Sequence, residues 1–200
     1  MRGHEYPRRL LADMLAVEVP IRLASIRANL TTDPGLPETW PPDPKSYLLA
    51  DELPMKEEKY PAVLITSTTS SVNTNLQAGL GEFIYEYSLT VGCAVVAARH
   101  GGEEASSLGR DRILLAIREA LMLNSSLAND CFAVVRDLSE ITGAAVENLQ
   151  GKAMSLGNIT FAVRVVEELT DPITDDEGNP VTITSHAEIV TAVDATHTLP

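Results

Sequence analysis

The stretch EFIYEYSLTVGCAVV, residues 82–96, decides the fold of this chain. Every odd position from Phe83 to Val95 is apolar, whereas the even positions include two glutamates, a serine and a threonine. Strict alternation predicts a β-strand with one buried face and one wetter face. Fifteen residues at about 3.3 Å each would span roughly 50 Å, which is longer than an ordinary strand. We therefore expect this strand to leave its own domain and to contact a neighbour.

A helix pattern follows almost at once, in EEASSLGRDRILLAIREALML, residues 103–123. Glu103 and Glu104 suit the positive end of a helix dipole, and Asn124 suits its end. Leu108, Ile113, Ile117 and Leu121 supply the apolar side that would pack on the sheet.

The N-terminal segment also has a helical pattern, from Arg8 to Leu30. An interior proline removes a hydrogen bond and clashes with the preceding turn, so Pro20 predicts a break. We expect two helices, roughly 5–18 and 20–31, with Val17 in the apolar set of the first and Ile21 on the buried side of the second.

Residues 34–61 hold seven of the twelve prolines and cannot form continuous helix or a central strand. We expect an extended connector that runs over the surface. Trp40, the only tryptophan, has two possible roles. It can anchor this connector to its own domain, or it can contact another subunit.

The remaining segments predict more strands. Tyr60–Thr66 forms a compact apolar strand, and the uncharged stretch Thr68–Gly81 reads as a loop that joins it to residues 82–96 in a long hairpin. Cys131–Leu138 and Lys152–Glu168 predict two further strands, with Gly157 marking a bulge or a bend in the second.

After Asp171 the chain is acidic and has no Lys or Arg. Within it, the Val/Ile/Thr-rich segment Val181–Val193 predicts an extra strand or an arm. The predicted organisation is a helical segment (1–33), a connector (34–60), a core domain (61–170) and an acidic arm or tail (171–200). The predicted fold class is α/β (α+β), with a mostly antiparallel sheet, one main helix packed on a face, N-terminal helices and a long β-hairpin arm.

The net charge of −13 excludes a surface that grips nucleic acid, because such surfaces are basic, and it disfavours anionic membranes. Acidic charge suits the wall of a conduit through which DNA must slide, and it also serves solubility alone. No segment approaches the length of a membrane-spanning helix.

No catalytic, cofactor or metal site is predicted. A nucleophilic set of Cys93, His100 and Asp111 is disfavoured because Cys93 lies on the buried face of its strand. The histidines lack ligand spacing, and the acidic turn at Asp175–Gly178 lacks the rest of a calcium loop. Cys93 and Cys131 are expected to be buried free thiols.

The pattern as a whole resembles the tail terminator (tail completion) proteins of long-tailed bacteriophages. The resemblance covers roughly residues 8–168. It lies in the N-terminal helix and proline-rich crossing, the strand YPAVLI (60–65), the strand end YSLTV (87–91), the helix GRDRILLAIREAL (109–121) and the closing strand GNITFAVRV (157–165).

This resemblance implies a structural virion protein, not an enzyme, that assembles in the host cytoplasm. It would form a homohexameric ring at the head-proximal end of the tail tube, stop tube polymerisation and join the tail to the head connector or neck. DNA would pass through the lumen. Candidate contacts with the tube protein or with the adjacent subunit are Ser70, Ser71, Asn73, Asn75, Gln77 and Trp40. Alternatives are another neck or tail component, such as a connector or tube protein, and a non-viral α/β binding module.

Overall fold

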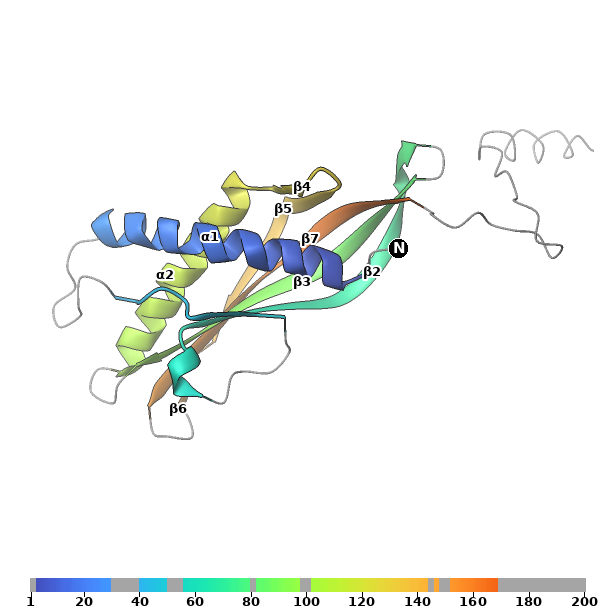
Figure 1. Cartoon of the computed structure of the whole chain (residues 1–200). Coiled ribbons are helices and arrows are strands. Elements are labelled where there is room, and N and C mark those ends of the chain that lie inside the picture. The colour runs from blue at the N-terminus through green and yellow to red at the C-terminus, as the bar shows by residue number, and fades with distance from the viewer. Residues whose placement is uncertain are drawn as a thin grey trace, which may run out of the picture.

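Two helices lie on one face of a curled β-sheet in the computed structural model (Figure 1). The structure describes residues 3–29, 40–49, 56–79, 82–97, 102–143, 146–147 and 152–168. Within them the elements are α1 (Glu5–Asn29), β1 (Ser46–Leu48), the 3-10 turn η1 (Glu57–Lys59), β2 (Ala62–Gly79), β3 (Glu82–Ala97), α2 (Gly102–Leu123), β4 (Ser126–Ala128), β5 (Cys131–Thr142), β6 (Val146–Glu147) and β7 (Ala153–Glu168).

The sheet is mixed but mostly antiparallel. Its strand order is β1-β2-β3-β7-β5-β4, and β6 also pairs with β7. Only β1 and β2 are parallel. The chain is thus a mixed α/β protein with a mostly antiparallel sheet, as the sequence predicts.

The centre of the sheet is the pair β3 and β7. Their register is continuous from Glu82 opposite Glu168 to Ala97 opposite Ala153. The side chains that point toward the helices are buried in both strands, and the alternate ones are mostly half-buried. The period of two predicted for residues 82–96 is therefore confirmed, because one face of the sheet forms the core.

Both helices contribute to that core. Leu11, Leu15 and Leu23 of α1 are fully buried, as are Ile113, Ile117 and Leu121 of α2. They form one cluster with the inward side chains of β2, β3, β5 and β7. The predicted helix at 103–123 is confirmed, and α1 packs against the same core.

Gly157 does not mark a bulge. β7 keeps a regular register with β3 on both sides of Gly157, and its pairing with β5 ends at Gly157 opposite Thr142. A Cβ at this position would lie 2.7 Å from Leu114 Cδ1 and 3.0 Å from Arg110 Cδ, so these side chains would have to shift to make room for it. Glycine is needed here because α2 approaches the sheet closely.

Pro20 does not divide the N-terminal helix, so the prediction of two helices is wrong. The single helix α1 runs through Pro20, and its buried residues Leu15, Val19 and Leu23 continue on both sides. Ala16, whose carbonyl would have bonded a residue-20 amide, is exposed, so water can take that hydrogen bond. The free energy gained by burying a continuous apolar face of α1 therefore exceeds the cost of a proline inside the helix.

The segment 68–79 is not a loop, which corrects a second prediction. It belongs to β2, an 18-residue strand that pairs with β3 as far as Gly79 opposite Glu82. Register shifts fall between Ser67 and Thr69, between Val72 and Gln77, and between Gln77 and Gly79. Residues 80–81 lie outside the described residues.

At the other side of the sheet, β5 confirms the strand predicted at Cys131–Leu138 and continues to Thr142. Cys131 and Ala133 point into the core, whereas Phe132 is 41% exposed. Cys93 and Cys131 are both free and buried, as predicted. The acidic segment 171–200 lies outside the described residues.

Replacing Gly157 with alanine should destabilise the fold by about 1–3 kcal/mol, because the added methyl group overlaps Leu114 and Arg110. Gly92→Ala is the matched control, since Gly92 lies in the adjacent strand and an added Cβ would meet its nearest atom at 3.8 Å. We expect the control to change stability by less than about 1 kcal/mol. Urea unfolding of both variants measures this difference, and equal midpoints would contradict the close-approach explanation.

Candidate assembly surfaces

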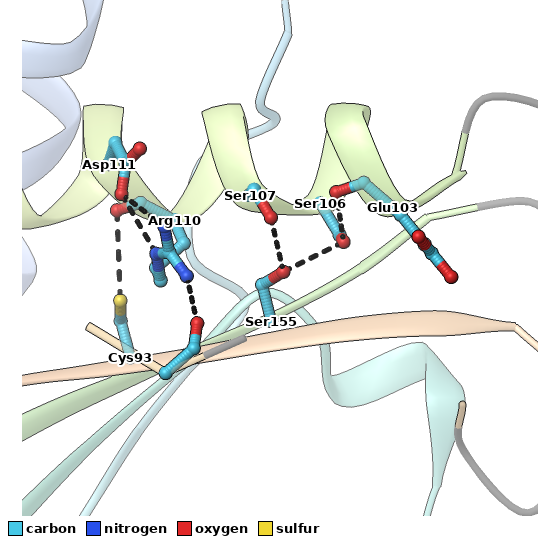
Figure 2. A network of polar contacts seen from close by, with 8 residues as sticks. Cys93, Glu103, Ser106, Ser107, Arg110, Asp111 and Ser155 are labelled. Carbon is cyan, nitrogen blue, oxygen red and sulfur yellow. Dashed lines mark hydrogen bonds and ion pairs between the residues drawn. The ribbon is translucent and has the colours of Figure 1, made fainter. Parts of the chain in front are cut away.

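Hydrogen bonds between serine hydroxyls join α2 to β7 (Figure 2). Ser155 Oγ of β7 lies 2.9 Å from Ser106 Oγ and 3.0 Å from Ser107 Oγ of α2. Ser106 Oγ also donates to the carbonyl oxygen of Glu103 at 3.0 Å. These hydroxyls thus bond to one another and to a backbone carbonyl oxygen. They hold the first turns of α2 against the sheet.

One turn further along α2, Arg110 fastens the helix to a loop (Figure 2). Its side chain is buried, donates to the carbonyl oxygen of Gly143 and pairs with Asp111 at 2.8 Å. The carbonyl oxygen of Arg110 lies 3.8 Å from Cys93 Sγ. Cys93 and Asp111, two residues of the disfavoured nucleophilic set, thus make structural contacts with Arg110. His100, the third, lies outside the described residues.

The environment of Cys93 also opposes nucleophilic chemistry. Burial raises the pKa of this thiol to about 12, and the nearby Arg110 guanidinium only partly offsets that effect. A thiol with this pKa is protonated at neutral pH, whereas the thiolate is the reactive form.

Among the residues that the structure describes, no group of three or more His, Cys, Asp or Glu side chains is placed to hold a metal ion. Neither α1 nor α2 is both long and apolar enough to cross a membrane. Within these residues, the features that remain are three surfaces.

The first surface is a part of the sheet that continues beyond the helices, which we call the extension. It comprises residues 68–79 of β2, 82–86 of β3 and 164–168 of β7, and Figure 1 shows these strands reaching past the start of α1. Residues 68–72 of β2 are exposed on both faces. The strand of residues 82–96 therefore does not project alone, because β2 and β7 accompany it to its end.

The base of the extension is held by buried aromatic and polar contacts. The hydroxyl of Tyr87 donates to Glu167 Oε1 at 2.7 Å, and Glu167 is buried. The ring of His4, at the start of α1, packs edge-on against Tyr87 at 5.0 Å, and His4 Nδ1 lies 2.6 Å from Ser67 Oγ. Burial and the neighbouring Glu167 raise the pKa of Tyr87, so its hydroxyl stays a donor. These contacts fix the direction in which the extension leaves the core.

The second surface is the side of the sheet that faces away from both helices, which we call the open face. On it Arg164 forms an ion pair with Glu86 at 2.9 Å, and the hydroxyls of Thr90 and Thr160 lie 3.1 Å apart between β3 and β7. None of the described helices packs on it. Its uncharged members include Leu64, Thr66, Ser88, Ala94, Val96, Phe132, Val134, Ile141, Met154, Leu156, Asn158, Ala162 and Val166.

The third surface is an apolar stripe on the outer side of α1. It consists of Val17, Ile21, Ala24 and Ala28, all exposed, and its largest members Val17 and Ile21 are 62% and 53% exposed. Their spacing of four, three and four residues places them on one side of the helix. The predictions that Val17 and Ile21 pack inward are wrong, because Leu15, Val19 and Leu23 take the buried positions.

The predicted contact residues do not form one site. Ser70 and Ser71 are exposed in β2, opposite Tyr87 and Glu86, and Asn73, Asn75 and Gln77 follow them in the same strand. Trp40 lies elsewhere, with Gly109 and Val95 as neighbours. Tyr87, which is opposite Ser70, and Val95, which is a neighbour of Trp40, are eight residues apart along β3. This separation corresponds to about 26 Å.

Trp40 is engaged inside its own chain. Its Nε1 donates to the carbonyl oxygen of Ala105 at 2.8 Å, and Arg112 donates to the Trp40 carbonyl oxygen at 2.7 Å. These bonds support the anchoring role for Trp40, and a contact with another subunit stays a prediction.

Sequence reasoning missed the buried arginines and the apolar stripe. Arg110 lies one turn before Ile113 and Leu114 on the apolar side of α2, and this position could have revealed its burial. The stripe could have been found by drawing residues 5–29 as one helix, which the expected break at Pro20 prevented.

No model of a protein family matches the sequence, and no curated protein is significantly similar to it.

We expect both thiols of the native protein to be unreactive toward DTNB at pH 8, because both are buried and the pKa of Cys93 is raised to about 12. Unfolding in guanidinium chloride should expose two thiols per chain. A Ser70→Cys variant provides the control, since this exposed position should add one fast-reacting thiol without altering the core. A fast-reacting thiol in the unaltered native protein would contradict the assignment of Cys93 and Cys131 to the core.

Proposed function

We propose that this chain is a structural subunit of a bacteriophage tail, which assembles with copies of itself into a ring at the head-proximal end of the tail tube. In this proposal it is the tail terminator, and the ring is a hexamer. The ring stops tube polymerisation and offers a surface to the head connector, and DNA crosses its lumen. The proposal joins the sequence resemblance to the surfaces described above.

The observation that carries the proposal is the extension. Residues 68–72 of β2 are exposed on both faces although they are paired with β3, and such a stretch gains little from the core of its own chain. A protein that acts alone has no evident use for it, whereas a subunit can place it against a neighbour or against the tube. We therefore treat the extension as a contact arm, which includes Ser70 and Ser71.

The positions of the other two surfaces support a ring. The stripe of α1 points away from the sheet, because the opposite side of α1 is buried against it. The open face lies on the far side of the sheet, so these two surfaces are on opposite sides of the subunit. Contacts between two different faces are heterologous, and they close into a ring when the rotation between subunits permits.

Charge is consistent with this function. The chain carries 28 acidic and 15 basic side chains, so a ring of these subunits would be strongly negative. A negative lumen repels DNA and lets it pass without adhering. The four residues of the stripe are uncharged, so burying them against a neighbouring subunit would not remove a charge from water.

The test is native mass spectrometry of the full chain together with electron micrographs of the same sample. A closed ring of about six copies that does not stack is the expected result. Long tubes would identify a tube protein instead, and a monomer at all concentrations, with or without tail tubes present, would contradict the proposal.

Val17→Asp combined with Ile21→Asp should break the ring into smaller species, because two charges would replace the apolar stripe and could not be buried unpaired. Both residues are exposed in the subunit, so thermal unfolding of the single subunit should change by less than about 1 kcal/mol. Met122→Asp is the matched control, since Met122 is 56% exposed on α2, away from the stripe. Equal loss of assembly in the control would assign the effect to added charge and not to the stripe.

A further inference from the structure

The two outer sides of the sheet differ in how they are protected against pairing with another strand. β4 covers the start of β5, and the uncovered remainder carries Arg136, Asp137 and Glu140 and a long register shift between Val134 and Ser139. Charges and irregular backbone are the usual means by which an edge avoids further pairing. This side of the sheet is therefore protected against pairing with additional strands.

The outer side of β2 differs in lacking charged residues, although its register with β3 also shifts. β1 pairs only with Ala62–Leu64, and Arg8 Nε donates to the carbonyl oxygen of Ile65 at 3.1 Å. From Thr68 to Gly79 no described strand lies beyond β2, and this stretch holds no charged residue and no proline. Its register shifts are its only irregularity. We call Thr68–Gly79 the free edge.

An uncharged edge of this kind offers its backbone groups to an incoming strand, as in β-augmentation. The sequence contains a segment of suitable length and composition at 181–193, VTITSHAEIVTAV, which has thirteen residues against the twelve of the free edge. It consists mostly of Val, Ile and Thr, has no proline or glycine, and carries one acidic side chain, Glu188. These are the properties of a strand that joins a sheet.

The direction and reach of the chain also fit. β2 and β7 both run antiparallel to β3, so they are parallel to each other and end at the same tip, where Glu82 pairs with both Gly79 and Glu168. A chain that turns back after Glu168 therefore runs antiparallel to β2. A strand added to β2 would lie three strand spacings from β7, about 15 Å, and residues 169–180 can span up to roughly 40 Å.

We propose that residues 181–193 add to the free edge of β2 in the same chain, as an antiparallel strand. The extension then has four strands, and the edge that lacks charges is covered by the segment that follows β7. This inference rests on the edge, on the common end of β2 and β7 and on the length of the linker, and it does not depend on the proposed function.

The test is hydrogen–deuterium exchange of the full chain, read by mass spectrometry over residues 68–79. Ile189→Pro removes an amide from the centre of the segment and breaks its pairing. We expect alternate amides of the free edge to exchange at least about tenfold faster in this variant. Thr196→Pro, which lies beyond the segment, is the matched control and should leave exchange unchanged. Peptides covering residues 89–95 and 159–163 verify that the core is intact.

A mixing experiment distinguishes a strand supplied by the same chain from a strand supplied by a neighbouring chain, whatever the oligomeric state. Isotopically labelled Ile189→Pro chains are mixed with unlabelled wild-type chains, and exchange is read from the labelled peptides. If the strand comes from the same chain, the amides of the free edge in the labelled chains continue to exchange fast. Recovery of protection in the mixture would overturn the proposal in favour of a second copy, and equal exchange in wild type and Ile189→Pro would overturn it altogether. The count of subunits by native mass spectrometry tests the ring separately.

Discussion

The uninterrupted pairing of β3 with β7 is the constraint on which the rest of the structure depends. Because side chains alternate across a strand, a shift of one residue would turn every buried side chain of a strand to the opposite face. The continuous register from Ala97 opposite Ala153 to Glu82 opposite Glu168 keeps Leu89, Val91 and their β7 partners under the helices. β2 and β5 pair with the outer sides of this unit, and α2 crosses it at Gly157.

Sequence reasoning succeeded where burial imposes a period. β3 and α2 are each packed along one side, so their apolar residues recur every two residues or every three to four, and both elements were predicted within a residue or two. It failed for residues 68–79 of β2, because these leave the helices behind and residues 68–72 are exposed on both faces. A strand without a buried face has no alternation, and its serines, threonines and asparagines resemble those of a loop.

The same physical reason limits what the sequence reveals of the assembly surfaces. Residues 70–77 could be proposed as candidate contacts because the stretch was interpreted as a long polar loop, although its secondary structure was mistaken. The stripe of α1 was hidden by the local effect of Pro20, which the burial of Leu15, Val19 and Leu23 overrides. The open face could not be read at all, since it exists only once four strands place their outward side chains next to one another.

Charge connects these surfaces. A strand that must stay in water as an edge commonly carries lysine, proline or an inward-pointing charge, and β5 carries three charged residues in its uncovered part. β2 has none beyond Leu64, in a chain whose net charge is −13. In such a charged chain, an uncharged segment as long as the free edge is best explained by partners that bury it: a strand alongside its backbone, and the surface of another molecule against the faces of the extension. The two proposals thus concern different sides of the same strand and are compatible with each other.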